Sequence, residues 1–96
     1  MALWKAVERE HARRLKGKRV PVNSTSGVEC DVQVDLYSVE SKERIHLPSL
    51  VEKAMIQAEG HCEPGKMALV VMHQKGTNYD KDIVFCRLKD FQERFV

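Results

Sequence analysis

The sequence contains no hydrophobic run that could cross a membrane, and it has few residues that break or cross-link a chain. Five Gly, three Pro and three Cys in 96 residues exclude collagen-like, low-complexity and disulfide-rich classes. No stretch approaches the roughly 18 apolar residues of a membrane helix, and the charged, amphipathic start lacks the hydrophobic region of a signal peptide. We therefore expect one small soluble domain spanning residues 1–96, located in the cytoplasm.

The cysteines and histidines are too scattered to predict a cross-linked or zinc-stabilised fold. Cys30, Cys62 and Cys86 are an odd number at spacings that match neither a disulfide framework nor a paired zinc knuckle. His61 next to Cys62 lacks a second pair of ligands. We expect reduced thiols and no structural zinc.

Charge is distributed unevenly along the chain. The net charge is +2, but the first 22 residues contain seven Lys or Arg and two Glu, so the remainder of the chain is negative. Such a basic segment favours a polyanion as partner. A solvent-exposed helix face would have the same excess of basic residues, and it is the better interpretation of that excess taken alone.

The first half of the chain predicts a helix followed by strands. Apolar residues at helical spacing predict an amphipathic helix over residues 2–16, ended by Gly17. We expect a short strand over residues 18–22 and a polar loop over residues 23–27. Residues 28–42 are rich in β-branched residues and are long enough for two strands.

The second half predicts a helix, two strands and a closing helix. Residues 49–59 predict the helix, because Ser49 and Glu52 have the spacing of a capping box. The continuously apolar residues 67–72 and 83–86 are typical of strands covered on both faces. A short helix should follow near the C-terminus. The order α, β, β, β, α, β, β, α predicts an α/β fold, a mixed sheet flanked by helices on both faces.

The triplet Glu40-Ser41-Lys42 is the most suggestive group for chemistry. Glu40 and Lys42 are two positions apart, so on a strand their side chains leave the same face. Carboxylates that hold Mg²⁺, next to a lysine that steadies a hydroxide, suit phosphodiester hydrolysis. The composition alone predicts about one such triplet by chance, so a surface charge pair is the favoured interpretation of the triplet taken by itself.

Three further residues make the triplet more informative. Asp31 belongs to an acidic run, from Val28 to Glu40, that contains no Lys, Arg or His, and unneutralised carboxylates favour a cation. Glu8 lies close to the apolar stripe of the first helix, as a boundary residue or as one that faces a ligand. Gln57 lies on a helix face that otherwise looks buried, where its amide needs a partner, most simply the backbone.

Taken in order, these residues resemble the PD-(D/E)XK nuclease superfamily, and within it the small Holliday junction resolvase-like proteins of phages and archaea. The resemblance covers roughly Trp4 to Leu88. It implies a restriction-endonuclease-like fold and a DNA endonuclease that leaves a 5′-phosphate. By this resemblance, the protein would act in the cytoplasm of a bacterium or of a phage-infected host cell.

The resemblance also implies a role for each candidate residue. Asp31 and Glu40 would bind Mg²⁺, for which Mn²⁺ could substitute, and Glu8 would add to the same metal site. Lys42 would position the nucleophile, and Gln57 would support the catalytic site. The basic residues of the first segment would then neutralise DNA phosphates; they are Arg13, Arg14, Lys16, Lys18 and Arg19.

Two positions depart from the family pattern without removing a ligand. Cys30 stands where the family often has a proline before the aspartate. Ser41 replaces the usual apolar residue between the acid and the lysine. The backbone carbonyl at this position can serve as a ligand whatever its side chain is.

The expected partners are branched DNA and a second copy of the chain. Resolvases of this type act as two-fold dimers, because a four-way junction has two strands to cut. Phe91, Phe95 and Val96 are candidates for the partner surface, although closing the chain's own core explains them slightly better.

Three other functions remain open on the sequence alone. The chain could be a general or nicking nuclease of the same fold. It could instead be a non-catalytic nucleic-acid-binding module, in which Asp31, Glu40 and Lys42 are surface charges. A structural partner protein would leave the basic segment unexplained.

Overall fold

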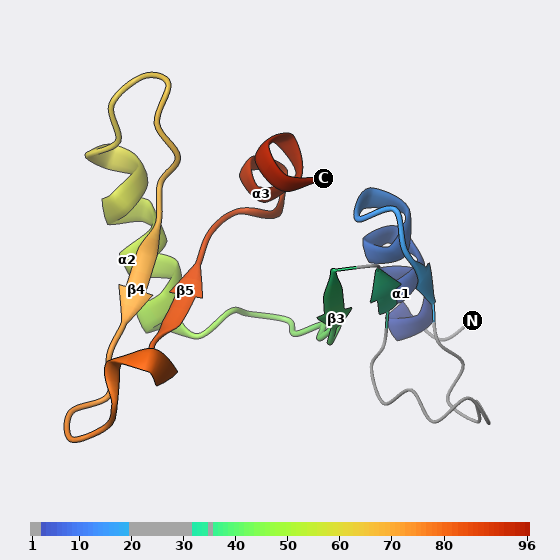
Figure 1. Ribbon diagram of the computed structural model, residues 1–96, viewed down its shortest axis with the longest axis horizontal. Coiled ribbons are helices and arrows are strands. Elements are labelled where there is room, and N and C mark those ends of the chain that lie inside the picture. Colours follow the sequence, from blue (N-terminus) through green and yellow to red (C-terminus); the bar gives the residue numbers. More distant parts are fainter. Residues whose placement is uncertain (1–2, 20–31, 35) are drawn as a thin grey trace. The chain divides into compact units, whose positions relative to one another are not determined.

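The computed structural model describes residues 3–19, 32–34 and 36–96, and it confirms the predicted order of helices and strands. The protein is a small mixed α/β protein (Figure 1). The chain forms two compact units, one up to Ile45 and one of His46–Phe95. The elements are α1 (Leu3–Arg14), β1 (Lys18–Arg19), β2 (Val32–Val34), β3 (Tyr37–Val39), α2 (Ser49–Gly60), β4 (Val70–Met72), the 3₁₀ helix η1 (Tyr79–Lys81), β5 (Ile83–Phe85) and α3 (Leu88–Phe95).

The first unit is a three-stranded antiparallel sheet with α1 packed against it. The strand order is β1-β2-β3, with Arg19 opposite Val32 and Val32 opposite Val39. α1 contacts β1 and β2, and Ala12 and Leu15 are buried. Because these residues belong to the apolar stripe of the helix, the predicted amphipathic pattern is confirmed here.

The first helix ends slightly before its apolar pattern does. Lys16 adopts a left-handed conformation, with φ of 57°, and the amide of Gly17 donates to the carbonyl of Ala12 at 2.8 Å. This bond satisfies a terminal helix carbonyl and turns the chain toward β1. The helix therefore ends close to Gly17, as predicted, but the residue with the left-handed conformation is Lys16.

The second unit pairs β4 with β5, antiparallel, and places α2 against β4. Figure 1 shows α2 running beside this hairpin. Val71 and Val84 lie opposite each other in the register, and both are exposed. The prediction that these strands are covered on both faces is therefore wrong within this unit. All strand pairs among the described residues are antiparallel and belong to two sheets, so the predicted single mixed sheet is not found in this part of the chain.

α2 begins without the predicted capping box. The N-cap position is occupied by Pro48, and no side chain caps the helix. Ser49 is already the first helical residue, so its hydroxyl lies one position too far along the chain to act as the cap. The amide of Glu52 donates to the carbonyl of Pro48 at 3.1 Å, and this backbone bond opens the helix instead.

Arg87 links the end of β5 to α2 by ion pairs. Its guanidinium donates to the two carboxylate oxygens of Glu59 at 3.2 and 3.0 Å, and it lies 3.6 Å from a carboxylate oxygen of Glu52. The hydrogen bonds from Arg87 hold the pKa of Glu59 below its usual value. This pairing adds an electrostatic contact to the apolar packing of α2.

The thiols of the second unit are free. Cys62 and Cys86 form no disulfide, whereas Cys30 lies outside the described residues. Burial, followed by the charge of Asp90, raises the pKa of Cys86, which lowers its thiolate fraction at neutral pH. Across the described ranges, no helix has the length and apolar character needed to span a membrane.

We predict that the second unit depends strongly on Met55, which is only 4% exposed on α2. Met55→Ala should lower the free energy of unfolding by about 2–3 kcal/mol, because it removes buried methylenes and leaves a cavity. Ile56→Ala on the same helix is the control, since Ile56 is 57% exposed, and it should change stability by less than about 0.5 kcal/mol. Urea unfolding measures both. Equal losses for the two variants would contradict this packing.

Candidate functional site

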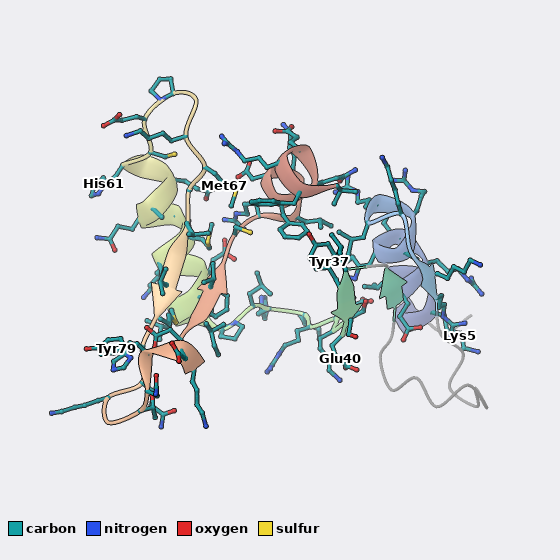
Figure 2. All side chains as sticks on the ribbon, viewed as in Figure 1. Lys5, Tyr37, Glu40, His61, Met67 and Tyr79 are labelled. Carbon is teal, nitrogen blue, oxygen red and sulfur yellow. The ribbon has the colours of Figure 1, made fainter. Side chains whose placement is uncertain are left out.

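Glu40 and Lys42 form an exposed ion pair immediately after β3. The Lys42 Nζ lies 3.5 Å from the Glu40 Oε2, and the side chains of Lys42 and Glu40 are 80% and 58% exposed, respectively. Figure 2 shows Glu40 at the end of β3. The two side chains approach each other as predicted, but both residues follow β3 and, contrary to the prediction, do not lie on a strand. A pair this exposed contributes only about 0–1 kcal/mol, so both groups can exchange partners at low cost.

Ser41, between these two residues, is bound to α1. Its Oγ lies 2.8 Å from the His11 Nδ1, in a partly buried hydrogen bond. The bond to His11 turns Ser41 toward the helix, whereas the side chains of its neighbours Glu40 and Lys42 are exposed.

His11 is a residue that sequence reasoning did not assign to the site. The signal that could have identified it is its position, because His11 is the polar member of the apolar stripe of α1. A half-buried imidazole at such a position needs a hydrogen-bond partner. The partner lies 30 positions along the chain, which no local pattern specifies.

Glu8 is a buried carboxylate that Arg19 neutralises. The Arg19 Nε donates to the Glu8 Oε2 at 2.6 Å, and Glu8 is buried while Arg19 is mostly buried. Glu8 precedes His11 by three positions on α1, so both lie on the helix side that faces the sheet. Glu8 therefore lies about one helical turn before the residue that contacts Ser41. Binding of a metal by Glu8 requires that Arg19 release or share it.

The predicted DNA-contacting residues divide into paired arginines and exposed lysines. Arg13 and Arg14 lie 2.6 and 3.3 Å from the same Glu10 oxygen, and the hydrogen bond from Arg13 lowers the pKa of Glu10. Lys16 and Lys18 are exposed and have no ion-pair partner in the part of the chain that the structure describes. These two ammonium groups can contact a phosphate without giving up an existing ion pair.

Asp31 and Gln57 are the two other candidate residues. Asp31 lies outside the described residues; it is the residue before Val32, which is opposite Val39 in the β2–β3 register. Gln57 is exposed on α2, in the second unit. Its predicted position on a buried face is wrong, because the less exposed positions of α2 include Val51, Met55 and Ala58.

The described residues contain no group of three His, Cys, Asp or Glu side chains that could hold a metal ion. Comparison of the chain with protein-family models, curated proteins and solved structures gives no match.

We predict that Arg19 is required for stability because of Glu8. Arg19→Ala should lower the free energy of unfolding by about 1–3 kcal/mol, since it leaves a buried carboxylate without its partner. Arg13→Ala is the matched control, because its partner Glu10 is exposed, and it should cost less than about 0.5 kcal/mol.

Urea unfolding of Arg19→Ala with and without Glu8→Gln separates the two causes. Removal of the charge at Glu8 should restore part of the lost stability. If the double variant is as unstable as the sum of the single variants, the ion pair is not the reason for the effect.

Proposed function

We propose that this protein is a Mg²⁺-dependent DNA endonuclease of the PD-(D/E)XK type that acts preferentially on branched DNA. The observation that carries the proposal is the Glu40–Lys42 pair. An acid and a lysine lie 3.5 Å apart on the open side of a segment whose other side is attached to α1 through Ser41 and His11. The proposal includes a fold of the restriction-endonuclease type.

The residues of the pair differ in what each can do for hydrolysis. The Glu40 carboxylate is an oxygen ligand of the kind that Mg²⁺ prefers. The Lys42 ammonium donates hydrogen bonds, so it can orient an attacking water and stabilise hydroxide or the charge that develops on phosphate. Both groups are exposed and 3.5 Å apart, so each is available to a metal ion or a phosphate.

The donor set fits a hard divalent cation better than a soft one. Glu40, Asp31 and Glu8 all offer carboxylate oxygens, and no thiol or imidazole is among the proposed ligands. Mg²⁺ held by these residues would polarise the scissile phosphate and activate water. Mn²⁺ prefers the same ligands and should substitute.

The charges of α1 and β1 support DNA as the substrate. Exposed Lys16 and Lys18 lie where the chain passes from α1 into β1, and they can neutralise phosphates near the acidic site. Arg13 and Arg14 can add to this surface by exchanging Glu10 for phosphate. The proposed preference for branched DNA and the proposed homodimer follow from the resemblance to junction resolvases.

A non-catalytic nucleic-acid-binding module is the second candidate, and one observation favours it. The carboxylate of Glu8 is already neutralised by Arg19 at 2.6 Å, as in a purely structural ion pair. In that case the basic surface would bind DNA, while Glu40 and Lys42 would be an ordinary surface pair. The two candidates predict different results for cleavage.

We predict that the wild-type protein cuts a labelled four-way junction in Mg²⁺ and not in EDTA. Glu40→Ala should abolish cutting, because it removes a proposed metal ligand. Glu43→Ala is the matched control, since Glu43 is exposed three positions further along, and it should retain cutting. A linear duplex of the same sequence, cut equally well, would indicate a general nuclease. Binding without any cutting would favour the non-catalytic module.

We also predict that Lys42→Ala separates binding from chemistry. The cleavage rate should fall by about 100-fold or more, because a donor to the developing charge is lost. Affinity for the uncut junction, measured by anisotropy in Ca²⁺, should change by less than about threefold, because one exposed phosphate contact contributes little. An equal loss of affinity and rate would assign Lys42 to DNA binding alone.

A further inference from the structure

The β4–β5 hairpin contains an ordered polar cluster far along the chain from the Glu40–Lys42 pair. His73 follows β4 and Asp82 precedes β5, and the His73 Nδ1 lies 2.6 Å from the Asp82 Oδ1. A carboxylate only accepts hydrogen bonds, so the Nδ1 carries the hydrogen. Asp82 is only 15% exposed. The ring of His73 is therefore held in a fixed orientation, and its Nε2 remains on the opposite side of the ring.

Tyr79 stacks on this oriented imidazole. The ring centroids are 4.1 Å apart and the rings are inclined by only 14°. Tyr79 is nevertheless 74% exposed, and Figure 2 shows it projecting from the η1 end of the hairpin. The Asn78 side chain caps η1 by accepting from the Asp80 amide at 2.9 Å. The tyrosine is thus an exposed aromatic ring that is already ordered.

A cavity of about 310 Å³ adjoins the histidine. Its polar side chains come from His73, Gln74, Thr77 and Lys81, and its apolar side chains come from Met72 and Ile83. The Thr77 hydroxyl donates to the Gln74 carbonyl at 2.8 Å, which stabilises the turn between the strands. The cavity therefore combines an ammonium group and an amide with an apolar wall.

The charges around the cavity suit a phosphate that lies next to a base. Lys75 and Lys81 are the lysines of the hairpin, and Asp80 and Asp82 are its acids. Asp82 accepts the hydrogen bond of His73, and Lys75 and Lys81 are exposed and form no ion pair among the described residues. An aromatic ring with adjacent cations is the combination with which proteins hold single-stranded nucleic acid.

We propose that the His73–Tyr79 stack is a docking site for an unpaired nucleotide of the DNA substrate. The base stacks on the exposed face of Tyr79, and the adjoining phosphate lies near Lys81. This inference rests on the proposed function, because it takes DNA as the ligand. It adds that the protein recognises a strand with unstacked bases, as found at a branch or a nick.

The test measures binding in EDTA, where no cutting occurs, with a labelled oligothymidylate of about 12 nucleotides and a duplex of matched length. Tyr79→Leu should weaken binding of the single strand by about 5- to 100-fold, the loss expected when one stacked base is released. Tyr79→Phe retains the ring and should stay within about twofold of wild type. Leu50→Ala, which removes an exposed apolar side chain elsewhere in the same unit, should also have no effect.

The outcomes separate this inference from the proposed function. Single-strand affinity that depends on Tyr79, with duplex affinity unchanged, supports the docking site even if the protein cuts no DNA. An unaltered single-strand affinity of Tyr79→Leu overturns the docking site even if the wild-type protein cuts junctions normally. No single-strand binding by wild type, or equal losses for both DNA forms, also overturns it. Circular dichroism of Tyr79→Leu verifies that the variant is folded.

Discussion

The hydrogen bond between His11 and Ser41 determines how the segment after β3 is presented. It joins α1 to the residues that follow β3 through two side-chain atoms that are 2.8 Å apart. Ser41 is thereby held against the helix, while its neighbours Glu40 and Lys42 are exposed and lie 3.5 Å apart. The proposed chemistry depends on this presentation more than on the ion pair itself, which is exposed and weak.

The first unit also shows how its charges are balanced before any ligand binds. The buried acid, Glu8, has a mostly buried cation as partner, and the exposed acid, Glu10, holds two arginines of α1. Exposed pairs exchange partners readily, whereas leaving a buried carboxylate without a partner costs about 1–3 kcal/mol. A DNA phosphate can therefore recruit Arg13 and Arg14 easily. Arg19 should stay with Glu8 unless a metal ion takes its place.

The features that the sequence predicted correctly depend on residues that are close together in the chain. The helices and strands occur in the expected order, because apolar periodicity follows from which side of each element is buried. The approach of Glu40 and Lys42 was predictable from their two-residue spacing, although neither residue lies on a strand. The cap of α2 was misplaced by one position, which is the usual precision of such boundaries.

The remaining features depend on contacts between distant segments. The partners His11 and Ser41 are 30 positions apart, and Glu8 and Arg19 are 11 apart, so no motif in either segment specifies them. Val71 and Val84 look like buried strand residues by composition, yet both stay exposed although α2 packs on β4. The stack of His73 and Tyr79 forms only because η1 folds back beside the end of β4.

The most direct test of the proposed metal site is to locate Mn²⁺ by its anomalous scattering in crystals of the protein grown with that ion. We expect an ion bound by carboxylate oxygens of Glu40 and Asp31 at about 2.2 Å, with the Lys42 ammonium group nearby. Crystals that bind Mn²⁺ only elsewhere, or that leave Glu40 paired with Lys42 and without metal at millimolar Mn²⁺, would contradict it.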